Sequence, residues 1–343
     1  MSRNKHLPIF PAVTDTRESV LITGANGFVG SRLCAHLLGQ GYRVFAQVRS
    51  SSNLTLLRDL QVEYCYGDIT EPNTLPEMVK GVDLIIHNAG LIKARKRKTF
   101  FDVNEQGTRN LLEAVTIHNP QVRRVIFISS VAAAGPSAPG HPLSESDQPH
   151  PITTYGESKL AGERVTLSFA GRLPVTILRP PAVYGPGDRG IYSIFNAVWL
   201  HLKPLIGDGS RKLQLVHVDD LCEGIARSLK ANVKSGGIYF IADKDAYEYR
   251  ALIEILVEAS GRWTIPLLLP SPAFRAIATV SELSFKALGA TPLLTREKTR
   301  ELNSSWEMDT TRARQELGFE SKIRFADGAR QTYDWYIKHG WLR

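Results

Sequence analysis

The chain has 343 residues, a formal net charge of +8 and three cysteines, and this length predicts one large domain with a smaller one attached. The cysteines form no CxxC pair and the histidines show no HExxH spacing, so we predict no disulfides, no metal site and a reducing, cytoplasmic environment. No stretch approaches the ~20 apolar residues of a membrane span, which excludes an integral membrane protein.

Residues 1–18 contain two prolines and no periodicity, and we predict a tail there. From Ser19 onward, short apolar runs rich in β-branched residues alternate with helical patterns. The runs are SVLITG, YRVFAQVRS, VEYCYGD, VDLIIHNAG, RRVIFISS and VTILRP. Strands that alternate with helices at this spacing imply right-handed βαβ crossovers, so we predict an α/β fold with a doubly wound parallel sheet.

A glycine-rich turn, TGANGFVG at 23–30, joins the first predicted strand to the first predicted helix. Glycine permits a tight turn, lets backbone amides approach a pyrophosphate and allows the helix to pack closely, and the amino end of the helix favours negative charge. We therefore predict a dinucleotide site here. The residues of this turn that we expect to contact the cofactor are Gly24, Asn26, Gly27, Phe28, Val29 and Gly30.

The end of the second predicted strand indicates which dinucleotide binds. An acidic residue at this place binds the ribose hydroxyls of NAD, whereas a basic residue suits the 2′-phosphate of NADP. The sequence reads AQVRSSSN, with Arg49 and no carboxylate. We therefore favour NADP, and NAD stays the alternative because an arginine here can also point into solvent.

Five basic residues occupy the six positions from Lys93 to Lys98. Such a run can meet nucleic acid, an anionic membrane surface or a phosphorylated substrate, or it can form a solvated loop. No zinc finger, RNP aromatic pattern or helix-turn-helix signature accompanies it, so nucleic acid is not expected as a partner.

The stretch TTYGESK, residues 153–159, sets Tyr155 and Lys159 four positions apart. Residues at this spacing lie on one face of a helix, so both side chains can reach one point. A phenol beside a fixed ammonium ionises more easily than its usual pKa of ~10 allows, and can then exchange protons with an alcohol or ketone. The pair alone also fits an ordinary exposed helix, so the surrounding motifs must decide.

After LRPPAVYGPGDRG the alternation breaks. We predict helix and loop over 187–214, strands at LQLVHVDD and GGIYFIAD, and mostly helix from about 245. An apolar segment at 263–289, interrupted by Arg275, Glu282 and Lys286, is expected to line a hydrophobic pocket, form a lid, contact a membrane or pack in the core.

Taken in order, these motifs resemble an extended short-chain dehydrogenase/reductase of the NAD-dependent epimerase/dehydratase superfamily. The resemblance extends from Ser19 to the carboxyl end. Its motifs are TGANGFVG, GDI at 67–69, HNAG at 87–90, VNEQGTRNLLEA at 103–114, FISSVAAAG at 127–135, YGESK, LRPPAVYGPGD at 178–188 and VHVDD at 216–220.

The resemblance implies a Rossmann doubly wound parallel sheet and a smaller, mostly helical C-terminal substrate domain. The expected divisions are a tail at 1–18, a nucleotide-binding domain at 19–186 plus about 213–243, and a substrate-binding region at 187–212 plus about 244–343.

Four catalytic roles follow from the resemblance. Tyr155 matches the acid/base, and Lys159 matches the residue that holds the nicotinamide ribose and lowers the pKa of the tyrosine. Ser130 matches the hydroxyl that binds the substrate oxygen, with Ser129 as the alternative. Asn104 matches a residue that supports the lysine through water.

The resemblance also implies cofactor contacts beyond the glycine-rich turn. Asp68 matches a carboxylate near the adenine amino group, with Ile69 beside the ring. The family more often has two alanines where this chain has Ala89 and Gly90. The other matched contacts are Asn88, Ala89, Gly90, Ser129, Tyr155, Lys159, Pro180 and Val183.

The substrate side separates the functions that share these catalytic residues. Nucleotide-sugar enzymes commonly carry an asparagine and an arginine where this chain has Ala182 and Leu213, although Arg211 and Lys212 precede the latter. The stretches SSVAAAGP at 129–136 and NSSWEMDTTRARQELGF at 303–319 resemble the 3β-hydroxysteroid dehydrogenase and dihydroflavonol reductase branch.

We therefore expect an oxidoreductase that interconverts a secondary alcohol and a ketone on a hydrophobic steroid-, flavonoid- or lipid-like molecule. The alternative is a nucleotide-sugar epimerase or dehydratase with tightly bound NAD, and a second alternative is a non-catalytic NADP-binding sensor or assembly factor. A homodimer through the helices of the asparagine and YxxxK motifs, and peripheral membrane contact, are further expectations.

Overall fold

The computed structural model describes residues 16–272, 276, 279 and 295–343. The tail predicted at 1–18 therefore lies almost entirely outside the described residues. The same holds for most of the apolar segment at 263–289, including Arg275, Glu282 and Lys286.

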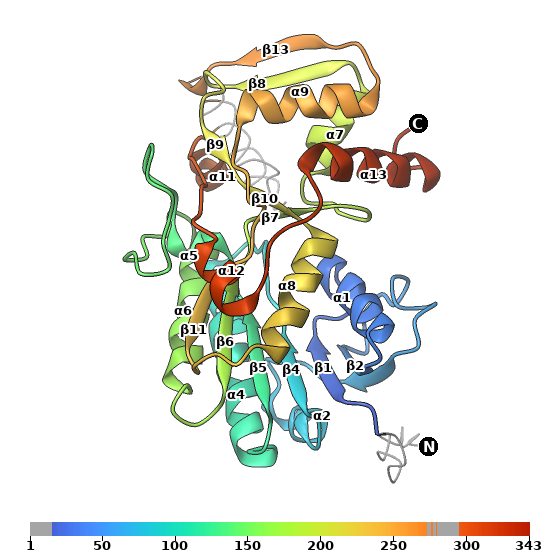
Figure 1. Ribbon diagram of the computed structural model, residues 1–343, viewed down its shortest axis with the longest axis vertical. Coiled ribbons are helices and arrows are strands. Elements are labelled where there is room, and N and C mark those ends of the chain that lie inside the picture. The colour runs from blue at the N-terminus through green and yellow to red at the C-terminus, as the bar shows by residue number, and fades with distance from the viewer. Residues whose placement is uncertain (1–15, 273–275, 277–278, 280–294) are drawn as a thin grey trace.

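A seven-stranded parallel sheet forms the centre of the larger part of the molecule (Figure 1). In spatial order its strands are β11 (Gly237–Phe240), β6 (Val175–Arg179), β5 (Arg124–Ile128), β4 (Leu84–His87), β1 (Ser19–Thr23), β2 (Arg43–Val48) and β3 (Glu63–Tyr66). Strands β1, β4 and β6 are buried along their whole length, which explains why their sequences are mostly apolar. The predicted doubly wound sheet is confirmed, and its strand order reverses between β1 and β4, where such sheets bind ligands.

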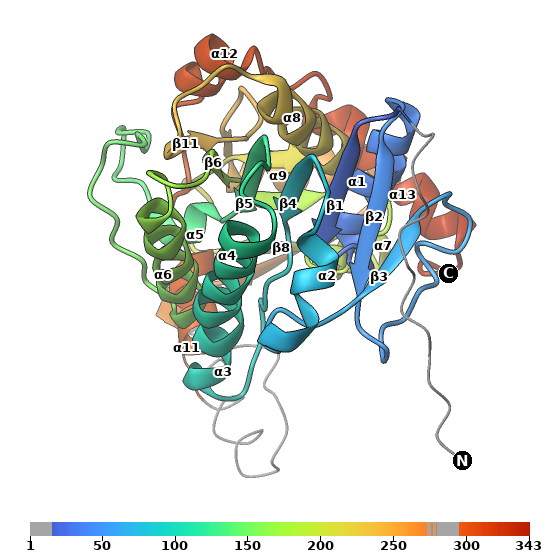
Figure 2. The same ribbon diagram turned by 90° about the horizontal axis from the view of Figure 1, so that it is seen from below.

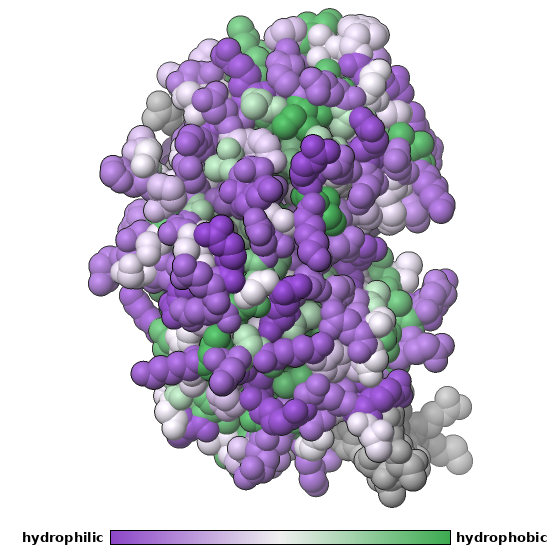
Figure 3. Space-filling model, viewed as in Figure 1, coloured by the Kyte–Doolittle hydropathy of each residue, from purple (hydrophilic) through white to green (hydrophobic). Residues whose placement is uncertain are grey.

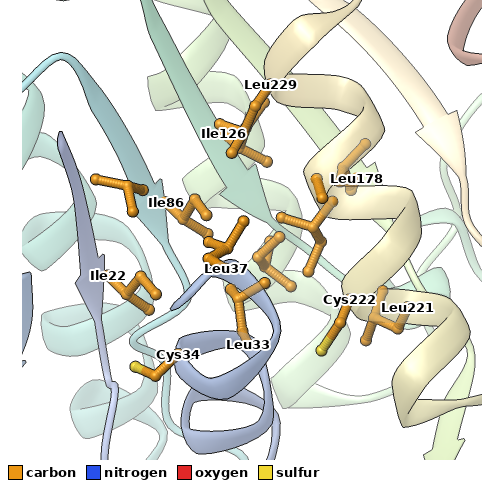
Figure 4. Packing of buried hydrophobic residues seen from close by; sticks show 14 of the residues in the cluster. Ile22, Leu33, Cys34, Leu37, Ile86, Ile126, Leu178, Leu221, Cys222 and Leu229 are labelled. Atoms are coloured by element: carbon orange, nitrogen blue, oxygen red, sulfur yellow. The ribbon is translucent and has the colours of Figure 1, made fainter. Parts of the chain in front are cut away.

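Helices cover both faces of the sheet. One face carries α1 (Phe28–Gly39), α8 (Val218–Lys230) and α12 (Thr311–Leu317), and the other carries α2 (Pro76–Val79), α4 (Gly107–His118) and α6 (Thr154–Ser168). Figure 2 shows α4 and α6 on the side of the sheet opposite to α8. In Figure 4, Leu33 and Leu37 of α1 lie beside Ile22 and Ile86 of the sheet, and Leu221 of α8 belongs to the same buried cluster. Each face thus has its own buried apolar layer.

Short elements connect these helices and strands. They are a 3-10 turn at Pro72–Thr74, α3 (Arg97–Phe101), a π-helical turn at Asp102–Gln106, α5 (Val131–Ala134), and a parallel pair of β7 (Ala182–Tyr184) and β10 (Leu215–His217). Within the described residues, no helix is both long enough and apolar enough to cross a bilayer.

A second group of elements, here called the C-terminal lobe, packs around its own core (Figure 1). It contains α7 (Tyr192–Trp199), β8 (Leu202–Ile206), β9 (Lys212–Leu213), β12 (Tyr247–Glu248), α9 (Tyr249–Ser260), β13 (Ile265–Leu269), α11 (Arg296–Leu302) and α13 (Phe325–Lys338). The helices follow the prediction, but β8 and β13 pair as a parallel two-stranded sheet where helix and loop were predicted. The pairing joins segments about 60 residues apart in sequence, so local propensity carries no signal for it.

Candidate active site

The turn between β1 and α1 leaves no room for side chains at two of its glycines. A β-carbon on Gly24, whose φ is +65°, would lie 2.9 Å from the Cα of Ala89. A β-carbon on Gly30 would lie 2.2 Å from the carbonyl oxygen of Gly24. The backbone therefore forms a bare cradle at the amino end of a three-turn helix, which fits the pyrophosphate of a dinucleotide.

Buried Gln47 of β2 ties this turn to the next cofactor motif, a role that the sequence analysis missed. Its Oε1 accepts a hydrogen bond from the Gly24 amide at 2.9 Å, and its Nε2 donates to the carbonyl oxygen of Gly67 at 2.6 Å. A lone polar residue in an otherwise apolar, buried strand was the available signal, because such a side chain must find partners.

Arg49 and Asp68, both predicted to face the adenosine half of the cofactor, lie together. Arg49 directly follows β2, and its guanidinium nitrogen stands 3.7 Å from Oδ2 of Asp68. The other oxygen of Asp68 accepts from the amide and hydroxyl of Thr70, at 2.9 and 2.8 Å. The Arg49 side chain is 64% exposed, so it is free to rotate toward a phosphate.

Ser130 lies beside Tyr155, whereas Ser129 points the other way. The Ser130 hydroxyl hydrogen-bonds the Tyr155 phenol, and its oxygen also accepts from the Ala132 amide at 3.2 Å at the start of α5. The Ser129 hydroxyl instead donates to Glu163 at 2.5 Å. Neighbouring residues in extended backbone point to opposite sides, so only one of the two serines can face the phenol.

Lys159 is buried one turn after Tyr155. Its Nζ donates to the carbonyl oxygen of Ile128 at 2.6 Å and lies 4.3 Å from the centre of the Phe127 ring. Burial lowers the pKa of Lys159 to about 8, and the negative charge of Glu163 opposes this shift.

Burial raises the pKa of Tyr155 to about 12, while the hydrogen bond from Ser130 lowers it and the charge of Glu301 adds to the rise. The lysine that was expected to lower this pKa donates to Ile128 instead. The phenol is therefore protonated at neutral pH and suits the role of proton donor.

Asn104 connects the loop after β4 to the catalytic helix. Its Oδ1 accepts from the Leu91 amide at 2.7 Å, and its Nδ2 donates to the carbonyl oxygen of Leu91 and to the Ser158 hydroxyl. A β-carbon on Gly90 would lie 3.3 Å from the Asn104 Oδ1 and 3.6 Å from the Lys159 Nζ. Glycine at this position therefore leaves space beside the lysine.

Three of the other predicted cofactor residues, Asn88, Ala89 and Pro180, follow the carboxyl ends of β4 and β6. Asn88 donates to the carbonyl oxygen of Gly24, and the Ala89 amide donates to the Thr23 hydroxyl at 3.0 Å. Pro180 accepts from the Val131 amide at 2.9 Å. Ile69 packs against Gly107 of α4, and Val183 lies on β7 against the sheet core.

His87 at the end of β4 is a second buried polar residue that the sequence analysis missed. Its two ring nitrogens lie 2.8 Å from the Thr23 hydroxyl and 3.0 Å from the Thr108 hydroxyl. Burial, followed by the charge of Lys159, lowers its pKa to about 3. The ring is therefore neutral and links β1, β4 and α4 behind the cofactor site.

Helix α11 of the C-terminal lobe contacts the amino end of α6. The Glu297 carboxylate accepts from the amide and hydroxyl of Thr154 at 3.1 and 2.8 Å. Thr154 directly precedes Tyr155. The lobe therefore contacts the residue before Tyr155 through α11, and no sequence motif indicated this contact.

The two stretches that resemble the hydroxysteroid dehydrogenase branch pack against each other. The Ser137 amide donates to the carbonyl oxygen of Ser305 at 2.9 Å, and the Leu143 amide donates to that of Glu307 at 2.8 Å. Trp306 and Met308 share a buried apolar cluster with Val131 and Ala134 of α5, the helix that follows Ser130. This cluster therefore packs the 303–319 stretch against the helix that directly follows Ser130.

The two basic residues near the expected diphosphate position, Arg211 and Lys212, both contact other residues of the chain. Leu213 packs in the apolar clusters. Arg211 is buried, donates to the carbonyl oxygen of Ile206 at 2.6 Å and lies 3.7 Å above the centre of the Tyr249 ring. Lys212 forms an ion pair with Glu307 at 3.3 Å.

Part of the basic run at 93–98 is also engaged within the chain. Arg97 forms an ion pair with Glu157 of α6, and Lys98 pairs with Asp102 at 2.6 Å. These contacts anchor α3 against the catalytic helix and the π-helical turn.

Comparison with known proteins shows what this chain is similar to. The model of the NAD dependent epimerase/dehydratase family matches residues 20–242. A ceramide reductase of Caulobacter vibrioides is 32% identical over 96% of this chain and 98% of its own length. A 3 beta-hydroxysteroid dehydrogenase/Delta 5-->4-isomerase of Mycobacterium tuberculosis is 28% identical over 95% and 92%. The solved structure of MoeE5 in complex with UDP-glucuronic acid and NAD is 25% identical, with a TM-score of 0.75 over 94% of this chain and 99% of that one.

Proposed function

Because the chain belongs to the NAD-dependent epimerase/dehydratase family, we propose that it is an NADP-dependent reductase of a ketone on a hydrophobic, lipid-like molecule. The observation that carries the proposal is the packing of Trp306 and Met308 against α5, which directly follows Ser130, together with Leu213 where a nucleotide-sugar enzyme would need an arginine. The names of the ceramide reductase and of the hydroxysteroid dehydrogenase support the same substrate class.

The catalytic residues suit reduction. When bound, the cofactor supplies the hydride that adds to the carbonyl carbon. Negative charge then builds on the carbonyl oxygen, so two hydrogen-bond donors must meet there. The Tyr155 phenol, which its raised pKa keeps protonated, gives its proton to that oxygen, and the Ser130 hydroxyl donates the second hydrogen bond. Lys159, buried one helical turn after Tyr155 and bonded to the carbonyl oxygen of Ile128, is proposed to hold the cofactor ribose.

The region formed by 187–212 and about 244–343 is proposed to bind the rest of the substrate. It contains most of the C-terminal lobe. Within the lobe, Glu297 of α11 contacts Thr154 at the start of α6. A movement of the lobe on binding the apolar chain of the substrate would therefore shift the start of α6, where Tyr155 lies.

A screen of substrates tests this function. Purified protein is incubated with NADPH and, separately, a long-chain oxidised ceramide, a 3-ketosteroid and an aromatic ketone, while nicotinamide absorbance is followed. We expect absorbance to fall with the lipid ketone. The nucleotide-sugar alternative draws support from the similarity to MoeE5. Conversion of UDP-sugars without added cofactor and without net absorbance change, with no ketone reduced, would establish it instead.

The cofactor preference is tested at Arg49. Replacing Arg49 by Asp places a carboxylate where the 2′-phosphate of NADP is expected, so we expect affinity to shift from NADPH toward NADH. The exchange also removes the ion pair with Asp68. Replacing Arg58, a nearby exposed arginine, by Asp is the matched control, because it changes the net charge equally. An unchanged NADPH to NADH ratio in the Arg49 variant would show that NADP is not selected here.

Peripheral membrane contact belongs to the same proposal. Half of the large hydrophobic side chains that are exposed in the described part of the chain lie on or beside β8 and β13. They are Leu200, Leu202, Trp263, Ile265, Leu267 and Leu268. The face of the molecule in Figure 3 is mostly hydrophilic, with scattered apolar residues. Arg262 precedes Trp263 and stacks 3.9 Å over the Trp199 ring, whereas Lys203 is paired with Glu254. A bilayer, the source of a lipid substrate, is the proposed partner.

Vesicle binding tests this contact. Leu268, which is 67% exposed, is replaced by Glu, and sedimentation with vesicles of phosphatidylcholine and phosphatidylglycerol is measured. We expect the bound fraction to fall several-fold, because a charge on this surface opposes insertion. Leu56→Glu, at an exposed leucine of the nucleotide-binding part, should bind like the unmodified protein. Equal binding of both variants, or a homodimer that Leu268→Glu dissociates, would contradict membrane contact.

A further inference from the structure

Three buried polar side chains form a closed network behind the catalytic residues. The Arg179 guanidinium binds both oxygens of the Glu163 carboxylate, from Nε at 2.9 Å and from Nη2 at 2.7 Å. The Ser129 hydroxyl donates to the same carboxylate at 2.5 Å. The two charged side chains are only 2% and 1% exposed. The pair is therefore bidentate, desolvated and joined to a third donor.

The network connects the ends of three elements that carry the site. Ser129 follows β5, Arg179 is the last residue of β6, and Glu163 lies in the middle of α6. Ser129 is covalently next to Ser130, and Glu163 is one helical turn beyond Lys159. A movement of the Glu163 carboxylate would therefore displace both the serine and the lysine of the site.

Stability alone is a weak reason for such a pair. Taking two charges out of water costs several kcal/mol per ion, and apolar replacements of buried ion pairs are often neutral or stabilising. Nη1 of Arg179 also lacks a hydrogen-bond partner among the described residues, which adds to the cost. The free-energy cost of burying this ion pair is therefore better explained by an effect on the neighbouring site residues than by a contribution to packing.

The charges around Lys159 show what that role is. His87 on β4 is neutral, Tyr155 on α6 is protonated, and Arg179 on β6 is a second buried cation. Asp102 on the π-helical turn pairs with exposed Lys98. Glu163 is the carboxylate whose charge acts on the lysine. Without it, Arg179 would lose its carboxylate partner, and Lys159 would lose the negative charge that opposes the lowering of its pKa.

We propose that Glu163 is a positioning residue whose buried carboxylate, held by Arg179 and Ser129, keeps the Lys159 side chain in place and cationic for the cofactor. The inference rests on the proposed cofactor site but not on the substrate. It predicts that the charge on Glu163 sets the pH range over which the protein binds NADPH.

Fluorescence titration with NADPH between about pH 6 and pH 10 tests the inference. Affinity should fall as pH rises through the Lys159 pKa of about 8, because the neutral amine attracts the cofactor less. Glu163→Gln keeps the shape but removes the charge, so the midpoint of this fall should move about one pH unit lower. Arg179→Gln removes the cation that is paired with Glu163, so the carboxylate should act more strongly on Lys159. The midpoint of the fall in NADPH affinity should therefore move to higher pH in this variant.

Glu157→Gln is the matched control, because it removes a carboxylate from the same helix at an exposed position. Its midpoint should equal that of the unmodified protein, and the titration of the NADPH phosphate is common to all variants. A folded Glu163→Gln variant with an unchanged midpoint would overturn the inference. If that variant does not fold, an unchanged or lower midpoint for Arg179→Gln overturns it equally.

The outcome is separate from that of the proposed function. Opposite shifts in the two variants, with no ketone reduced, would leave the inference standing and refute the substrate class. Absence of NADPH binding by the unmodified protein at every pH would refute the inference itself. Circular dichroism of each variant establishes that the fold is retained.

Discussion

Replacing Tyr155 by Phe is expected to lower turnover by ~100-fold or more, the usual loss when a general acid is removed. The phenol lies against the Ser130 hydroxyl, and its raised pKa keeps the proton available at neutral pH. The ring remains in the variant, so the wall of the site and the binding of NADPH should stay nearly intact. Loss of the single hydrogen bond should cost about 1 kcal/mol of stability.

Steady-state reduction of the lipid ketone and NADPH titration, measured on the same preparation, separate these effects. Tyr66→Phe, at a tyrosine that is 48% exposed on β3, removes an equivalent hydroxyl far from the chemistry and should leave turnover unchanged. If Tyr155→Phe keeps full turnover, the tyrosine is not the proton donor. If it loses NADPH binding as well, the residue acts through the cofactor rather than through the substrate oxygen.

Replacing Gly30 by Ala should nearly abolish cofactor binding. The added β-carbon would stand 2.2 Å from the carbonyl oxygen of Gly24 and 2.8 Å from the Cα of Ala25. Both neighbours are backbone atoms, so the turn must open to admit the methyl group. We expect affinity for NADPH to fall on the order of 100-fold, as positioning errors of ~1 Å can cause. Overpacking should also cost about 1–3 kcal/mol of stability.

The same helix offers the control. Gly39 ends α1, and a β-carbon there would meet no atom within 4 Å. Gly39→Ala should therefore leave NADPH affinity unchanged and stabilise the helix by up to about 1 kcal/mol. Fluorescence titration and thermal denaturation of both variants give the comparison. Equal affinities in the two variants would show that the turn does not hold the pyrophosphate.

The central sheet could be predicted because its signals are local. A strand buried on both faces is mostly apolar, and the sequences of β1, β4 and β6 are. The glycine-rich turn was equally readable, since Gly24 and Gly30 stand where only glycine fits. The pair of Tyr155 and Lys159 lies on one helix, so its spacing already placed both residues on one face.

The choice between two neighbouring serines required the structure. Nothing in the dipeptide tells which hydroxyl faces the tyrosine, because that depends on how the end of β5 meets α6. Ser129 turns to Glu163 and Ser130 turns to Tyr155. Gln47 and His87 were likewise visible only as polar residues in apolar strands, and their partners come from other strands and helices.

The sequence by itself thus determined the doubly wound sheet, the glycine-rich turn and the spacing of the catalytic pair, because each depends on contacts within one element or across one turn. Tertiary structure alone decided the pairing of β8 with β13, the contact of Glu297 with Thr154 and the burial of Glu163 with Arg179. These join residues distant along the chain, and their geometry depends on how separate elements pack. The residues that would surround a substrate belong to this second group, which is why the sequence indicates a candidate acid/base pair more fully than it indicates a substrate.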